Sequence, residues 1–83
     1  MKIEYSKDVV KYLKRLDKPT RQRFHTAFKN LSAIPPQGDI KPMRGERNVY
    51  RLRVGDFRVL FTIDADSDII LVTRIAPRGK IYK

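Results

Sequence analysis

The spacing of apolar residues changes near the middle of the chain, and this change limits the folds that the chain can adopt. In residues 24–31 apolar side chains recur every three or four positions, which places them along one side of an α-helix. From Val49 onwards they alternate with polar side chains, which is the period of a strand with one face on a core. Helices and strands therefore occupy separate segments, as in an α+β domain.

Two helices are expected in the first half. Residues 2–5 alternate polar and apolar and predict a short strand before them. Ser6 is a suitable N-cap for the first helix, and Pro19 is tolerated in the first turn of the second. The pair Pro35-Pro36 ends the second helix. Each helix has one apolar side, so the two are expected to form a hairpin that packs on one face of a sheet.

Three strands are expected in the second half. The segment 37–48 has no sustained periodicity and is interpreted as a loop. Strands follow over residues 49–54, 57–63 and 69–75, which are rich in β-branched and aromatic residues. The whole chain, residues 1–83, is then a single α+β domain of order β-α-α-β-β-β, with a two-helix hairpin on one face of a small antiparallel sheet.

A two-residue turn at Gly55-Asp56 fixes the register of the first hairpin. Val54 then faces Phe57, and Arg53 faces Arg58. The core face of these two strands is expected to carry Tyr50, Leu52, Val54, Phe57, Val59, Phe61 and Ile63. A symmetric second turn would pair Ile63 with Ile69. The core would then also receive Ile69, Leu71 and Ile75, and Arg74 would lie opposite Arg58.

The other face of the sheet is expected to be cationic. It carries Arg51, Arg53, Arg58 and Arg74, with no acidic residue from the same three strands. Directly opposed like charges destabilise a sheet, so this arrangement favours a phosphate-binding surface over arginines that merely extend into water. Loss of Arg53 or Arg58 is expected to leave stability unchanged or slightly higher.

The net charge also favours a polyanionic partner. The chain has 19 Lys and Arg against 9 Asp and Glu, a net charge of +10. A charge of this size attracts nucleic acid. The chain begins MKIEYSKD, lacks cysteine and has no apolar run long enough for a membrane span, so a cytoplasmic protein without membrane contact is expected.

Conventional catalytic and metal-binding sets are not evident in the sequence. The single histidine, His25, falls within the second predicted helix and is interpreted as a helix-surface or core-edge residue. The acids at 64–68 lack the glycine and distal glutamate of a calcium loop. We therefore expect no metal and no cofactor. A nuclease built on this chain would depend on positioning, charge stabilisation and an unusual proton carrier.

The strand residues resemble a known family. The run from Val49 to Phe61, VYRLRVGDFRVLF, followed by IAPRGKIYK from Ile75 to Lys83, looks like the RelE family of toxins. The order of elements is also similar, so the resemblance covers essentially the whole chain. It implies the toxin of a type II toxin–antitoxin system, a metal-independent endoribonuclease (mRNA interferase) that binds the ribosomal A site and rRNA, cleaves mRNA there and inhibits translation. It also implies a cognate antitoxin as partner.

The resemblance assigns roles to individual residues. Arg53, Arg58, Arg78 and Tyr82 would be catalytic, and Arg51 would bind RNA phosphates. Arg74 is expected to bind phosphate as well, from its predicted place on the arginine face rather than from the resemblance. Some members have lysine at positions 51 and 53. Arginine effectively cannot lose a proton, so here these residues suit phosphate binding, and Tyr82 is the candidate base.

Two alternatives remain at this point. A ParE-like toxin shares the fold but binds and inhibits DNA gyrase without nuclease activity. A plain RNA-binding module is the other alternative, although exposed aromatic residues for base stacking are not evident on the arginine face.

Overall fold

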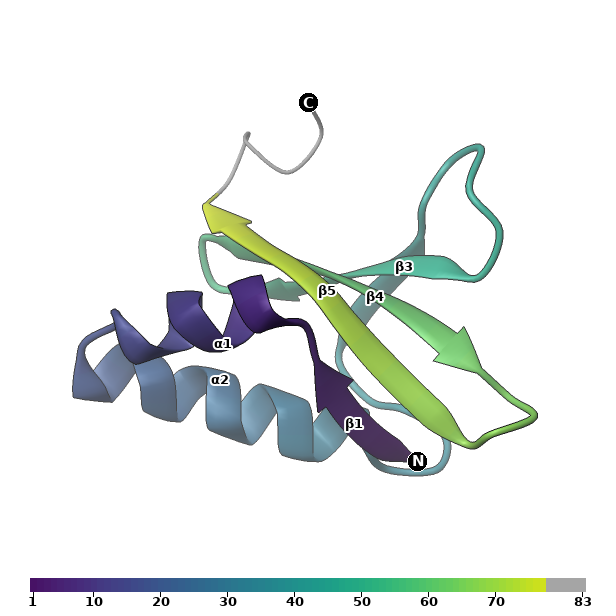
Figure 1. Cartoon of the computed structure of the whole chain (residues 1–83), viewed down its shortest axis with the longest axis horizontal. Helices are drawn as coiled ribbons and strands as arrows, with labels where there is room; N and C mark the ends of the chain where they lie inside the picture. Colours follow the sequence, from purple (N-terminus) through teal and green to yellow (C-terminus); the bar gives the residue numbers. More distant parts are fainter. Residues whose placement is uncertain (78–83) are drawn as a thin grey trace.

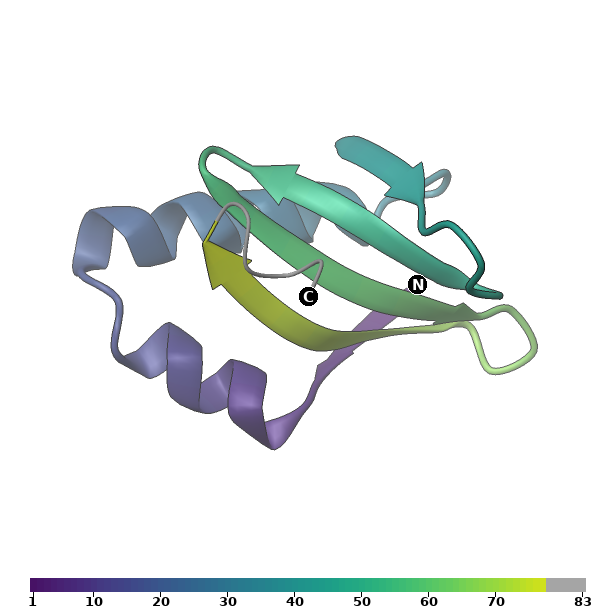
Figure 2. The same ribbon diagram turned by 90° about the horizontal axis from the view of Figure 1, so that it is seen from above.

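The computed structural model describes residues 1–77, and it consists of two helices packed on one face of a five-stranded sheet (Figure 1). The elements are β1 (Lys2–Tyr5), α1 (Lys7–Lys14), α2 (Lys18–Leu31), β2 (Asp39–Pro42), β3 (Val49–Val54), β4 (Phe57–Asp64) and β5 (Ile69–Pro77). Viewed from above, the strands lie over the helical hairpin (Figure 2). The predicted α+β class and the two-helix hairpin are confirmed. Neither helix in this part of the chain is long and apolar enough to cross a membrane.

Both helices begin at the capping residues that their sequences supply. The Ser6 hydroxyl accepts a hydrogen bond from the Val9 amide at 3.3 Å, which satisfies one of the free donors at the start of α1. The Asp17 carboxylate accepts from the Thr20 amide at 3.4 Å at the start of α2. Its hydrogen bonding with Thr20 lowers the pKa of Asp17. The predicted helix starts are therefore correct.

The sheet is mixed, in the order β1-β5-β4-β3-β2, because the edge strand β1 runs parallel to β5. The other three pairings are antiparallel. The strand β2 lies in the segment that was expected to be a loop. It is only four residues long and ends in Pro42, which is tolerated because β2 is an edge strand.

The β3–β4 hairpin has the predicted register. Val54 pairs with Phe57, Arg53 with Arg58 and Arg51 with Leu60. Gly55 adopts a φ of 59°, which a first central turn residue needs in a type II′ turn and which glycine reaches without steric cost.

The β4–β5 pairing differs from the prediction in two places. Ile63 pairs with Ile70 rather than Ile69, so Ile70 enters the core and Leu71 lies on the opposite face. A bulge at Leu60/Phe61 then leaves Thr73 as an extra residue on β5 and reverses the alternation.

The reversed alternation decides which residues at the end of β5 face the core. Ile75 returns to the core, as expected. Arg74, by contrast, pairs with Leu60, while Arg58 pairs with Ala76. The sequence prediction assumed a symmetric turn between β4 and β5. It could therefore anticipate neither the one-residue change in pairing nor the bulge.

The core lies between the helices and the apolar face of the sheet. Its most buried members come from both layers: Val9, Phe24, Leu31, Leu52, Val59, Phe61, Ile70 and Val72. The aromatic ring of Phe24 on α2 meets that of Phe57 on β4 edge-on, with centroids 5.1 Å apart. This packing fixes one face of the sheet against the helices. The helices do not cover the opposite face of the sheet, which carries the arginines.

Replacing Gly55 with alanine tests the turn. A non-glycine residue at this positive φ is expected to cost about 1–2 kcal/mol of unfolding free energy. The new Cβ would also meet the Arg23 guanidinium of α2. Urea denaturation of Gly55→Ala should therefore show reduced stability, and the loss should be smaller when Arg23→Ala is the starting protein. An unchanged urea midpoint would contradict this account of the turn.

Candidate phosphate-binding site

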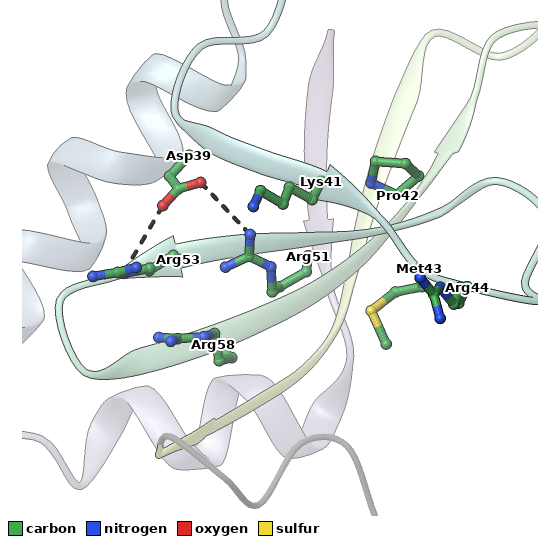
Figure 3. Close-up of a pocket in the computed structure, with 8 residues that line it drawn as sticks. All are labelled: Asp39, Lys41, Pro42, Met43, Arg44, Arg51, Arg53 and Arg58. Carbon is green, nitrogen blue, oxygen red and sulfur yellow. Dashed lines mark ion pairs between the residues drawn. The ribbon is translucent and has the colours of Figure 1, made fainter.

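A cationic hollow of about 460 Å³ lies on the sheet face opposite the helices (Figure 3). Its lining comes from β2, the segment after it, β3 and β4, and consists of Asp39, Lys41, Pro42, Met43, Arg44, Arg51, Arg53 and Arg58. Five of these side chains are cationic and one is a carboxylate. The hollow therefore concentrates positive potential where an anion could enter, and guanidinium groups suit phosphate in particular.

Arg58 is the most firmly held of the three strand arginines. The residue is 9% exposed, and its Nη1 donates to the backbone oxygen of Phe57 at 3.2 Å and of Gly55 at 3.5 Å. It thus lies across the end of its own hairpin. Arg53, its direct cross-strand neighbour, has a side chain that is 55% exposed. The predicted pairing of these two arginines is confirmed, and the structure shows that their environments differ.

Arg51 lies beside the pair and is also largely covered, with 8% of the residue exposed. Its Nη2 atom lies 3.6 Å from Oδ1 of Asp39. The other carboxylate oxygen, Oδ2, lies 3.9 Å from Nε of Arg53. One acidic side chain therefore contacts two of the site arginines, as the dashed lines in Figure 3 show.

Sequence reasoning missed Asp39, Lys41 and Arg44, because the whole segment was interpreted as a loop. A weak signal was present. Asp39, Ile40 and Lys41 alternate polar, apolar, polar, and Ile40 packs against the core while the other two line the hollow. The alternation is too short to be distinguished from chance without the strand beside it.

The remaining predicted site residues lie elsewhere or outside the described residues. Arg74 pairs with Leu60 and lines a separate hollow of about 420 Å³ beside Asp8 and Tyr12 of α1. It is not among the residues that line the arginine hollow. Arg78 and Tyr82 lie outside the described residues. His25 is exposed on α2.

Comparison with known proteins places the chain in a family. The sequence profile of a family described as the ParE toxin of the type II toxin–antitoxin system, parDE, matches residues 3–82. The chain therefore belongs to the RelE/ParE family of toxins of type II toxin–antitoxin systems.

Within this family, the chain is similar to proteins that carry the RelE name. The putative toxin RelE1 of Methanocaldococcus jannaschii is 34% identical, over 98% of this chain and 93% of its own length. The toxin RelE3 of the same organism is 33% identical, over 99% and 96%.

Solved structures agree with this assignment. A chain in the crystal structure of the archaeal RelE–RelB complex from Pyrococcus horikoshii superposes with a TM-score of 0.81 at 28% identity, covering 95% of this chain and 96% of that one. The isolated RelE toxin of E. coli has a TM-score of 0.79 at 13% identity, covering 98% and 89%. The E. coli likeness concerns the fold alone.

The different environments of Arg53 and Arg58 predict different effects on stability. Arg58→Ala removes the donor to two turn carbonyls and should lower the free energy of unfolding by about 1–2 kcal/mol. Arg53→Ala removes an exposed side chain and a like-charge contact, so its effect should stay below about 0.5 kcal/mol. Urea denaturation of the two proteins in parallel measures both. Equal losses would show that burial of Arg58 has no bearing on stability. This replaces the expectation, made from the sequence, that neither arginine contributes to stability.

Proposed function

We propose that this toxin is a ribosome-dependent endoribonuclease that cleaves mRNA in the ribosomal A site, in the cytoplasm, and so inhibits translation. The observation that carries the proposal is the clustering of Arg51, Arg53 and Arg58 in one hollow, from two adjacent strands. Such a cluster suits a phosphate that gains negative charge during a reaction. The RelE names of the similar archaeal proteins support this function over gyrase inhibition.

The proposed chemistry is a transesterification at one phosphate of the mRNA. The ribose 2′-oxygen gives its proton to a base and forms a bond to phosphorus, while the bond from phosphorus to the 5′-oxygen breaks and that oxygen takes a proton from water. The products are a 2′,3′-cyclic phosphate and a 5′-hydroxyl. Arg53 and Arg58 stabilise the charge of the phosphorane, and Arg51 holds the RNA backbone. Arg74, from its separate position, would contact RNA beyond the hollow.

Proton transfer requires further residues, since a guanidinium remains protonated at any ordinary pH. We assign the base to Tyr82, whose phenolate form nearby guanidinium groups would favour, and the leaving-oxygen contact to Arg78. The ribosome would orient the substrate in a site of this kind, and orientation alone can contribute up to about 7–11 kcal/mol to lowering a barrier. Free RNA is therefore expected to be a poor substrate.

We also propose an antitoxin as a protein partner. Solved relatives from Pyrococcus horikoshii and Methanococcus jannaschii are RelE–RelB complexes. The net charge of +10 suits an antitoxin segment that is acidic or of mixed charge and that folds on the toxin.

Toeprinting on programmed ribosomes tests the activity. Wild-type protein should cut mRNA in the A site, and Arg53→Ala should slow single-turnover cleavage by about 10²-fold or more, comparable to the loss of one donor to a developing oxyanion. Arg21→Ala is the matched control, because Arg21 is exposed on α2, on the opposite side of the sheet. Intact mRNA together with inhibition of DNA gyrase by the same preparation would establish the ParE-like function instead.

The assignment of Tyr82 predicts a specific loss of rate. Tyr82→Phe removes only the hydroxyl and should slow cleavage on the ribosome by at least about 10²-fold, the low end for a lost acid–base group. Arg78→Ala should also be slow, and the double variant should be little worse than the slower single one, because both residues act in the same transesterification step. Ribosome binding should remain nearly unchanged. Cleavage by Tyr82→Phe at the wild-type rate would remove the tyrosine from the mechanism.

A further inference from the structure

The carboxylate of Asp39 lies inside a hollow whose other charged lining residues are all cationic. We propose that Asp39 is the resident counter-ion of the hollow: it holds Arg51 and Arg53 in the free protein, and an RNA phosphate must displace it. This inference rests on the proposed function, since it concerns how the same hollow takes its substrate.

The two ion pairs have the geometry of an exchangeable contact. The carboxylate lies 3.6 Å from Arg51 and 3.9 Å from Arg53, both beyond the 2.7–2.9 Å typical of a charge-assisted hydrogen bond. The side chains of Asp39 and Arg53 are about half exposed, at 48% and 55%. The Asp39–Arg53 pair is therefore of the exposed kind that contributes little to stability, whereas the Arg51 side chain in the other pair is only 9% exposed. A phosphate can approach the same guanidinium groups more closely and accept two parallel hydrogen bonds from each.

The backbone keeps Asp39 in competition with the substrate. Asp39 is the direct cross-strand partner of Arg53 in the β2–β3 ladder, so its Cα cannot move away unless β2 separates from the sheet. The side chain can rotate, but its charge stays close to any bound phosphate. A carboxylate close to a phosphate weakens binding through like-charge repulsion.

A purely structural role for Asp39 fits the site less well. The most firmly held site arginine is Arg58, which is buried and hydrogen-bonded to backbone oxygens, and residues 1–77 provide it with no carboxylate within ion-pair distance. The carboxylate instead contacts Arg51, which is largely covered, and Arg53, the most exposed of the three. Asp39 is therefore placed where it lowers the affinity for RNA that is free in solution. A substrate that the ribosome has already oriented loses less entropy on binding and can displace it.

The test measures binding of a short single-stranded RNA with 2′-O-methyl groups, which cannot undergo the transesterification. Fluorescence anisotropy over a range of salt concentrations gives the dissociation constant and its salt dependence. Asp39→Asn should bind about 3- to 10-fold more tightly than wild type, as removal of one like charge near the phosphate implies. The plot of the logarithm of the association constant against the logarithm of the salt concentration should also steepen, because the freed guanidinium groups neutralise more RNA phosphates and release more of the RNA's counterions.

Matched variants separate this effect from net charge. Asp66→Asn makes the same change in charge in the turn between β4 and β5, at least four residues along the sheet from Leu60, the cross-strand partner of Arg51, or about 13 Å at the usual rise of a strand. That distance exceeds the screening length in physiological salt, so Asp66→Asn should bind like wild type. Asp39→Glu keeps the charge and should stay close to wild type. Asp39→Ser is measured in parallel, so that a folding defect in the Asn variant does not decide the result.

A double-mutant comparison assigns the effect to the hollow. In an Arg51→Ala/Arg53→Ala background, Asp39→Asn should no longer tighten binding. The proposal is overturned if Asp39→Asn and Asp39→Ser bind no more tightly than wild type, if Asp66→Asn matches them, or if the gain persists without the two arginines. Failure of the proposed function looks different: the Asn variant would bind RNA more tightly, yet neither it nor wild type would cut mRNA on ribosomes.

Discussion

The turn at Gly55-Asp56 is the constraint on which the site depends. With two residues in the turn, Val54 must face Phe57, and every later cross-strand pair of β3 and β4 follows from that one. A slip by one residue would turn the apolar side chains into water and the arginines into the core. The positive φ of Gly55 therefore shapes the candidate site as well as the fold, because it sets the register that brings Arg53 and Arg58 together.

The same register places Arg53 and Arg58 opposite each other, and the two side chains are stabilised by different partners. Two opposed guanidinium groups repel each other, which is unfavourable in a small sheet. Arg58 is held by the carbonyl oxygens of its own turn, so its position does not depend on a counter-ion from residues 1–77. Arg53 and Arg51 share the carboxylate of Asp39 instead. The hollow thus combines one cation fixed by the backbone with two whose partner can be exchanged.

Local patterns predicted the parts of the molecule that local interactions determine. The hairpin register, the helix cap at Ser6 and the cluster of Arg51, Arg53 and Arg58 all follow from spacings of a few residues. What the sequence could not show are pairings between distant segments. The strands β1 and β5 lie near opposite ends of the sequence, yet they pair in parallel. The strand β2 is recognisable as a strand only once β3 lies beside it. The bulge at Thr73 is of the same kind, since it needs knowledge of both strands.

These long-range features have unequal consequences for the candidate site. The one-residue change in the β4–β5 pairing and the bulge together displace Arg74 by two residues, so it pairs with Leu60, although simple alternation had placed it opposite Arg58. The edge strand β2 has the larger effect, because it supplies Lys41 and the carboxylate of Asp39 to a surface that had been expected to carry arginines alone. A sheet of unopposed arginines would bind any polyanion strongly and with little discrimination. A carboxylate held in the same ladder sets a threshold for binding, which a well-oriented phosphate passes more readily than a freely diffusing one. The discrimination of this surface would then reside in its one acidic residue as much as in its arginines.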